Sequence, residues 1–472
     1  MRVARRLLHA LLLVVTLIVG ATAAAIIVSQ TAWFKNWLRG YIVSEANNYL
    51  NGQLSIERLG GNLFFGVELE NIGVTMDGSE VVAVQDLGLD YNVFDLITKG
   101  LSVDNIRLNR PTIYLRRDGD TWSIAKLVKK QEQEADRQGP QSPITIDDIG
   151  ISDATVVIDD PVGTAGVEVP ERIDRIDAKL AFKYEPVRYS IEISHVSFRA
   201  SHPDLALNAL SGGVSVKDDT LFVDKLAMRT AESSVLVDGA VQHYLSTPKL
   251  NLQVTSDKLS IPEIARLVPS LGGIALQPAF EFKLNGPLDK LGVDMNVRSS
   301  AGQVTGQLVA DVQAPGQAVR GDVHVRHLDL APLLKDQSQK SDLTADLHAD
   351  VTAASFSDLD SLRGRAALRA PRVAASGYSA ENIQADAAFQ GRRVTLDARA
   401  IAYGTAATAK GAVTIPFGSD PLAFDLRGRA SHLDLAKLPR DLKVPPASSR
   451  FSNASSNGAS GCAGTCSRSA IS

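Results

Sequence analysis

Apolar and polar side chains alternate along most of the chain. In the segment LTADLHADV, Leu343, Leu347 and Val351 share one face of an extended strand, and Asp346 and His348 share the other. A period of two residues is typical of a strand with one apolar and one hydrated face. Strict alternation also favours antiparallel sheets, because parallel sheets are built from continuous apolar runs. The chain is therefore predicted to be mainly β.

The same alternation recurs in segments such as FEFKL and GDVHVR, and it predicts a long apolar face. Two arrangements account for such an apolar face. One is an open sheet that curls around an apolar groove, and the other is a sandwich in which two apolar faces pack together. Aromatic residues make up only 6% of the chain, so the apolar area comes mainly from Val, Leu, Ile and Ala. Candidate groove residues are Phe280, Phe282, Leu284, Val323, Val325, Leu343, Leu347 and Val351.

Three segments of the chain share one order of features, and this internal repeat is its most specific organisational signal. In each segment a glycine lies within a strand, a proline follows, and a leucine-containing motif comes next. The pattern predicts strand, turn, strand and then a short capping helix, with Ser260, Asp329 or Asp434 at the helix cap. The glycines are Gly239, Gly306 and Gly411, the prolines are Pro248, Pro315 and Pro421, and the motifs begin at Leu259, Leu328 and Leu433.

The N-terminal region has a different pattern. Residues 7–28 carry no formal charge, and a helix of that length spans about 33 Å, enough to cross a membrane. Arg2, Arg5 and Arg6 precede it, which predicts a cytoplasmic N-terminus. A cleaved signal peptide is the alternative, but the apolar stretch exceeds an ordinary signal core, which favours an uncleaved anchor. Both interpretations predict export of the rest.

Residues 29–52 continue at helical spacing, and they predict an amphipathic helix next to the membrane. Its candidate membrane-interface residues are Trp33, Phe34, Trp37 and Ile42. An ordinary helix packed on the rest of the protein accounts for the same spacing equally well.

Composition divides the remaining chain into four parts. Residues 53–128 form a first β domain, residues 129–143 a polar linker, and residues 144–445 a repetitive β body. Residues 446–472 are rich in Ser, Gly and Ala and hold both cysteines, Cys462 and Cys466. This tail is predicted to be disordered. A genuine flexible tail and a shifted reading frame both explain its composition.

Catalytic chemistry has no strong candidate in the sequence. A net charge of −4 argues against nucleic acid as a partner, and no phosphate-binding or hydrolase motif occurs. His324 and His327 are predicted on opposite faces of a strand, so no shared metal is expected. Acidic pairs at Asp147–Asp148, Asp159–Asp160 and Asp218–Asp219 are interpreted as strand ends or turns. The expectation is a protein without enzymatic activity, metal or cofactor, and an envelope hydrolase is the disfavoured alternative.

Several segments resemble the AsmA-like family, which includes TamB-type proteins. The resemblance covers about residues 1–445 and rests on the order of weak motifs, among them DLITKG, RRDGDTWSI, PITIDDIGISDATVVIDDP and LDLAPLL. It implies a single-pass protein of the bacterial inner membrane with a periplasmic body. It also implies a role in outer-membrane biogenesis, through phospholipid transport or through assembly of outer-membrane proteins. The implied partners are the membrane, phospholipids and, in the second case, an outer-membrane barrel protein.

One departure from the family is expected. The long C-terminal part with which TamB-type proteins meet an outer-membrane partner has no counterpart here, so the chain is expected to be a shortened member that does not span the periplasm alone.

Overall fold

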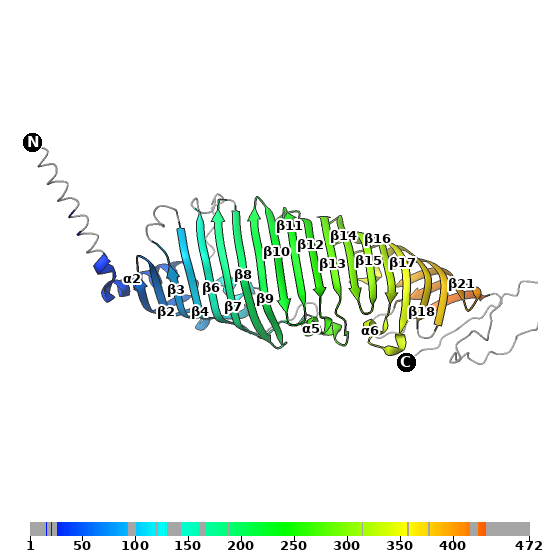
Figure 1. Ribbon diagram of the computed structural model, residues 1–472, viewed down its shortest axis with the longest axis horizontal. Coiled ribbons are helices and arrows are strands. Elements are labelled where there is room, and N and C mark those ends of the chain that lie inside the picture. Colours follow the sequence, from blue (N-terminus) through cyan, green and yellow to red (C-terminus); the bar gives the residue numbers. More distant parts are fainter. Residues whose placement is uncertain are drawn as a thin grey trace, which may run out of the picture. The chain divides into compact units, whose positions relative to one another are not determined.

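The computed structural model (Figure 1) describes residues 16, 20, 26–92, 101–118, 121–127, 129, 143–159, 167–186, 188–313, 315–355, 358–375, 378–415 and 423–430. The chain divides into two compact units. Unit 1 comprises residues 1–231 and 266–270, and unit 2 comprises residues 232–265 and 271–472.

Unit 1 holds one sheet in which each strand pairs with the next along the chain. All of these pairs are antiparallel except β4 with β6, which are parallel. A short segment, β5 (Thr121–Trp122) and α4 (Ser123–Lys126), lies between those two strands in the sequence. The paired strands are β1 (Gln53–Asn62), β2 (Gly66–Met76), β3 (Ser79–Asp90), β4 (Leu101–Asp118), β6 (Ile144–Asp159), β7 (Arg172–Glu185), β8 (Arg188–Ser201), β9 (Leu205–Lys217) and β10 (Thr220–Thr230).

Irregular steps in the alternation of unit 1 correspond to β-bulges. In β6 the apolar residues step from Ile146 to Ile149 and from Ile151 to Ala154, and the pairing with β7 shifts at both steps. Side chains alternate between the two faces of a strand, and the extra residue of a bulge shifts this alternation by one position. Each bulge in β6 therefore keeps the apolar side chains that follow it on the same face as those before it. The prediction that Asp147–Asp148 end a strand is therefore wrong, since both lie at a bulge inside β6.

The other two acidic pairs differ from this one. Asp218–Asp219 form the turn between β9 and β10, as predicted, and both have positive φ angles of 47° and 60°. Positive φ at both central residues is the geometry of a tight hairpin turn, which Asp tolerates well. Asp159 is the last residue of β6, and Asp160 lies outside the described residues.

A helix covers the first strands of unit 1. Helix α2 (Ala32–Tyr49) packs Leu38, Ile42 and Val43 against the buried side chains of Ile56, Leu59 and Leu69. These three buried leucine and isoleucine residues come from β1 and β2. One buried apolar cluster of unit 1 therefore lies between this helix and the start of its sheet.

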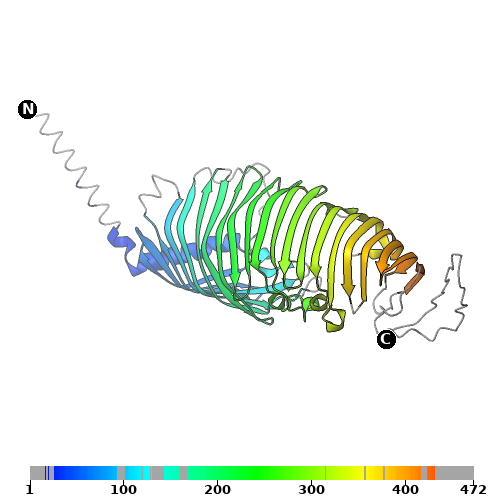
Figure 2. The same cartoon turned by 45° about the vertical axis from the view of Figure 1, so that its right-hand side comes forward.

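Unit 2 holds a second run of paired strands, each antiparallel to the next, and Figure 2 shows them in chain order. The strands are β11 (Ser234–Gln242), β12 (Lys249–Lys258), β13 (Ala279–Pro287), β14 (Leu291–Ser299), β15 (Gly302–Asp311), β16 (Gln317–Leu328), β17 (Ser341–Ala353), β18 (Arg363–Ala375), β19 (Tyr378–Gln390), β20 (Arg393–Ala402), β21 (Thr405–Thr414) and β22 (Ala423–Ala430). Short helical turns interrupt them at α5 (Ile261–Ile264), α6 (Ala331–Leu334), η2 (Gln337–Gln339) and η3 (Leu359–Ser361). A further turn, η1 (Pro269–Leu271), lies at the boundary of the two units in the sequence, with Pro269 and Ser270 in unit 1.

The repeat has the predicted order of elements where it is described. After Gly239 the chain forms a turn, β12 and α5, whose N-cap Ser260 accepts a hydrogen bond from the Glu263 N–H. After Gly306 it forms a turn, β16 and α6. The N-cap of α6 is Leu330 and not the predicted Asp329, but the Asp329 carboxylate, one residue earlier, accepts a hydrogen bond from the Ala331 N–H at 3.1 Å. After Gly411 the second strand is β22, and the motif at Leu433 lies outside the described residues.

The prediction of a mainly β protein with an open sheet and short helices is confirmed. The predicted curl is not supported. Regular pairing accounts for one part of unit 2, because the pairs from β12 to β16 run in unbroken register, without the bulges that bend a sheet sharply. Register shifts occur in the same unit at β11–β12, β16–β17, β17–β18 and β19–β20.

The membrane anchor and two other predictions fall largely on residues that the structure leaves undescribed. Within its described part, the chain has no helix long and apolar enough to cross a membrane. Most of residues 7–28, residues 130–142 of the predicted linker and the whole tail lie outside that part, as does the motif DLITKG.

Candidate functional site

The register of unit 2 places the predicted groove residues on one apolar face. Phe282 of β13 lies opposite Met295 of β14, and the row continues through Gly306 and Val323 to Leu347 of β17. Parallel rows on either side contain the other candidates, namely Phe280, Leu284, Val325, Leu343 and Val351. Strands far apart in the sequence thus build one surface from residues that alternation alone identified.

This apolar face is incompletely covered. All eight predicted groove residues are half-buried, and none of them is fully buried. Side chains between two packed sheets are normally buried, because the inner faces of a sandwich interdigitate. The observed burial therefore favours an uncovered sheet face over the sandwich that the sequence also allowed.

Small residues flatten part of the face. Gly306 is buried, and the side chains of its neighbours lie over it. A Cβ at this position would lie only 2.7 Å from Met295 Cε and 3.4 Å from a Val323 methyl group. Ala345 and Ala349 fill the same role between the larger side chains of β17. The result is a shallow surface of large side chains that lean over small ones.

The opposite face of the same strands carries charged pairs. Between β16 and β17, Arg320 contacts Asp350 at 2.6 Å, His348 contacts Asp322 at 2.9 Å, and His324 contacts Asp346 at 2.7 Å. Hydrogen bonds from His324 and then Arg326 lower the pKa of the Asp346 carboxyl. One face of β16 and β17 therefore carries charged side chains, and the other presents hydrocarbon.

The prediction that His324 and His327 lie on opposite faces is wrong. His327 contacts Asp342 at 3.0 Å, and Asp342 shares the polar face of β17 with Asp346, the partner of His324. The cause is a bulge between Val325 and Leu328, where His327 has a positive φ of 52°. Each histidine has its own aspartate, and the described residues contain no group of side chains suited to a metal ion.

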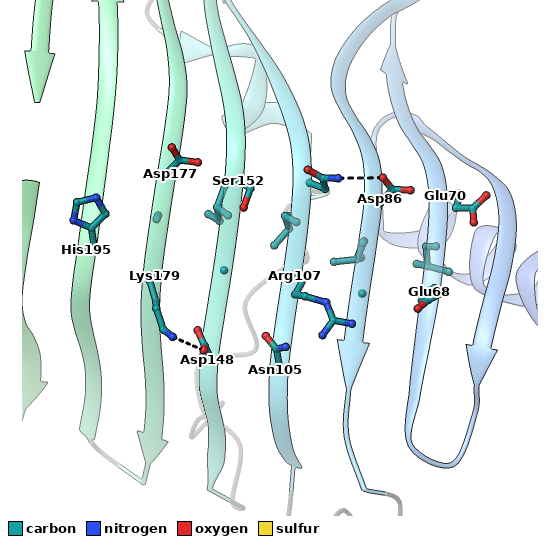
Figure 3. A pocket seen from close by; sticks show the side chains of 18 residues that line it. Glu68, Glu70, Asp86, Asn105, Arg107, Asp148, Ser152, Asp177, Lys179 and His195 are labelled. Atoms are coloured by element: carbon teal, nitrogen blue, oxygen red, sulfur yellow. Dashed lines mark hydrogen bonds and ion pairs between the residues drawn. The ribbon is translucent and has the colours of Figure 1, made fainter. Parts of the chain in front are cut away.

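A polar hollow on the sheet of unit 1 is a second candidate surface, and sequence reasoning missed it. Side chains from β2, β3, β4, β6, β7 and β8 line a space of about 720 Å³. Figure 3 shows these side chains. Two contacts cross it, Lys179 to Asp148 at 2.9 Å and Asn109 to Asp86 at 3.3 Å. Its other labelled side chains are Glu68, Glu70, Asn105, Arg107, Ser152, Asp177 and His195.

The hollow follows a line of bulges that crosses several strands. Arg110 and Asp153, each at a positive φ near 50°, face one another on β4 and β6 at 3.9 Å. Asp177 Oδ1 accepts a hydrogen bond from the Asp153 N–H at 3.0 Å and so connects the line to β7. In the sequence the doublet Asp147–Asp148 was the signal for this feature, because it marks a bulge of β6.

The predicted membrane-interface residues divide between two faces of α2. Trp33 and Trp37 are 71% and 54% exposed, whereas Phe34 is half-buried. Ile42 lies on the packed face of the helix, against the core of unit 1. The flanking residues Arg2, Arg5 and Arg6 lie outside the described part of the chain.

Comparison with protein families gives one match. The AsmA family model matches residues 1–169, a range that ends just after β6. Residues 1–169 are therefore AsmA-like. Comparisons with curated proteins and with solved structures found no match. The family match covers α2 and the first strands of unit 1, and the apolar face of unit 2 lies beyond it.

Proposed function

We propose that this AsmA-like protein carries phospholipid in the bacterial envelope by shielding acyl chains on the apolar face of unit 2. The observation that supports this function best is the half-exposed apolar surface formed by residues such as Phe282, Val323 and Leu347. AsmA family membership is consistent with a role in the envelope. In this proposal the protein is anchored in the inner membrane, its body is periplasmic, and carriage involves no covalent catalysis.

The energetics suit acyl chains. Removal of apolar surface from water contributes about 25 cal/mol per Å², so an acyl chain on this face gains stabilisation along its whole length. On β16 and β17 this face offers no charged side chain to a bound acyl chain, since the charged pairs of these two strands occupy the opposite face. A flat hydrocarbon surface shields chains without selecting one fatty acid.

Site-specific photocrosslinking in cells tests the proposal. A photoreactive residue at Leu347 or Val323 faces the apolar side, and one at His348 or Asp322 is the matched control on the polar side of the same strand pair. We expect phospholipid adducts, identified by mass spectrometry, at the first two positions and several-fold weaker labelling at the controls. Equal labelling at all four positions would contradict carriage by this face.

A different crosslinked product would favour the other function in which the family is implicated. Adducts at Leu347 and Val323 with an outer-membrane barrel protein, in the absence of lipid adducts, would indicate an assembly factor instead. Such a factor binds clients through sheet edges or apolar surfaces. Its signature is a protein-sized shift of the crosslinked band.

A further inference from the structure

Helix α2 has two chemically different faces. Its inner face holds Leu38, Ile42 and Val43, which pack on β1 and β2. Its outer face presents Trp33, Trp37 and Tyr41, which are 71%, 54% and 57% exposed. These three follow one another at intervals of four residues, so they form a single stripe over the first turns of the helix.

The stripe is ordered as well as exposed. The ring centroids of Trp37 and Tyr41 lie 5.9 Å apart with the rings stacked, and Phe34 lies 5.4 Å from Trp37. Aromatic pairs at such distances stabilise one another. The other exposed positions of the helix hold Ala32, Asn36, Gly40, Ser44, Glu45, Asn48 and Tyr49, and Glu45 is the one charged residue among them.

The basic residues of the helix do not belong to this outer face. Lys35 donates a hydrogen bond to the Gly61 carbonyl oxygen at 2.7 Å, and Arg39 donates one to the Glu57 carbonyl oxygen. Both acceptors belong to β1, so these cations fasten the inner side of α2 to the sheet. Glu45, which accepts from Asn48 at 3.2 Å, lies beyond the aromatic stripe towards the C-terminus of the helix.

The C-terminal end of the helix is also fixed. The Lys129 ammonium donates to the carbonyl oxygens of Asn47 and Asn48 at 3.2 and 3.0 Å, where a cation is favourable because free carbonyl groups concentrate negative charge. Asn47 Oδ1 accepts from the Leu54 N–H at 2.7 Å. The helix therefore holds its outer stripe in a constant orientation with respect to β1.

From these observations we propose that α2 lies in the interface of a lipid bilayer, with Trp33, Trp37 and Tyr41 at headgroup depth, and thereby orients β1 against the membrane surface. The residues just before the helix point to a bilayer rather than a protein partner. Ile26, Ile27 and Val28, at 41%, 68% and 46% exposed, end the uncharged segment 7–28 and lead directly into the stripe. Trp and Tyr are the residues enriched at membrane interfaces.

The absence of cations from the outer stripe sets the chemistry of the contact. Binding through lysine and arginine depends on anionic lipid and weakens with salt. Binding through aromatic rings depends on neither. The inference goes beyond the proposed lipid carriage, because α2 can contact a bilayer whether or not unit 2 binds acyl chains.

Depth-dependent fluorescence quenching tests it on the full chain in phosphatidylcholine vesicles. The three tryptophans are Trp33, Trp37 and Trp122, so replacing two by Phe leaves one reporter in each variant. Trp122, on β5 at 38% exposed, is the control within unit 1. We expect shallow brominated lipids to quench Trp33 and Trp37 several-fold more strongly than deep ones, and to leave Trp122 unaffected. This pattern should persist at about 1 M salt, where surface electrostatics are screened.

Three other outcomes would overturn the proposal. Stronger quenching by deep bromines would place these rings in the bilayer core, as in a spanning helix. Protection of Trp37 from aqueous acrylamide without quenching by any brominated lipid would indicate that a protein covers the stripe. Equal acrylamide quenching of Trp37 and Trp122 would leave the stripe in water. Lipid adducts at Leu347 are measured separately, so failure here does not imply failure of lipid carriage.

Discussion

At the scale of single residues, backbone conformation decides which side chains each position accepts. Two neighbouring glycines of β9 show the contrast. Gly212 has a φ of 134°, and a Cβ there would lie 2.6 Å from the Lys225 carbonyl oxygen, whereas the nearest atom to a Cβ on Gly213 is a side-chain carbon at 3.5 Å. Gly212 faces the apolar side between Leu210 and Val214, where close approach of strands leaves no space.

Alanine at these two glycines should have unequal effects. Gly212→Ala forces an unfavourable φ and a backbone clash, so we expect it to lower the free energy of unfolding by about 2–3 kcal/mol. Gly213→Ala should change it by less than about 0.5 kcal/mol. Chemical denaturation followed by circular dichroism measures both, and equal losses would show that the conformation of Gly212 is not the constraint.

A second residue-scale prediction concerns Asp329 in the repeat motif. Hydrogen bonds from the N–H groups of Ser341 at 2.9 Å and Ala331 at 3.1 Å lower the pKa of its carboxyl below the ordinary 3.8. A lowered folded pKa means that the charged form stabilises the fold above the ordinary value, and that this stabilisation is lost as pH falls through the lowered pKa.

Two substitutions separate the charge of Asp329 from its geometry. Asp329→Ala removes the acceptor, so its melting temperature should fall below that of the parent chain at pH 7. Asp329→Asn keeps an acceptor oxygen and should retain most of the stability, but the part of the acid dependence below about pH 4 should diminish. Thermal unfolding from pH 7 to pH 2 compares the three proteins, and an unchanged pH profile in the Asn variant would contradict the assignment.

At the scale of elements, alternation predicted the strands and their apolar faces well, whereas bulges and coverage escaped prediction. The sequence correctly predicted Leu347 and Val325 on one face, because side chains alternate with a period of two in the paired parts of β16 and β17 that contain them. The doublet Asp147–Asp148 was misinterpreted because a polar pair within an alternating run marks either a turn or a bulge, and only the neighbouring strand decides between them.

Helix α2 shows the same limit. Helical spacing grouped Trp37 and Ile42 together, but they point to different surroundings, since five residues of an α-helix rotate by about 140° beyond one full turn. Which side met the sheet was not encoded in spacing. The buried cluster of Ile56, Leu59 and Leu69 determined it.

The two faces of α2 predict opposite effects for adjacent substitutions. Ile42→Ala should lower the free energy of unfolding of unit 1 by about 1–2 kcal/mol, because a half-buried side chain leaves its contacts with the core. Tyr41→Ala should lower the free energy of unfolding in detergent by less than about 0.5 kcal/mol, since the Tyr41 ring is exposed. Parallel denaturation curves test the pair. A greater loss from the Tyr41 change would mean that the outer stripe has a packing partner within the chain.

At the scale of the whole molecule, strands exchange hydrogen bonds with their immediate neighbours in each unit, an arrangement shared with repeat proteins. Stability in such proteins is a sum of local terms, so damage to one strand remains near that strand.

Hydrogen exchange should reveal this locality. Gly411 has a φ of 155°, and a Cβ there would lie 2.0 Å from the Asp425 carbonyl oxygen of β22. Gly411→Ala should therefore accelerate amide exchange in β20, β21 and β22 and leave β2 to β4 unchanged. Mass spectrometry of peptides resolves these strands, and a uniform increase along the chain would show global cooperativity instead.

The repeat of strand, turn, strand and capping helix has a consequence for how such a chain can change in length. Each copy of the repeat returns the chain to the same end of the strands, where α5 follows β12 and α6 follows β16. Gain or loss of a single strand would reverse the direction of the strand that follows. The capping helix after that strand would then lie at the opposite end of the strands. Lengthening by duplication should therefore proceed in hairpins, in increments of about 9–10 Å of sheet width. Related chains are expected to differ by even numbers of strands, a parity that sequence comparison can count.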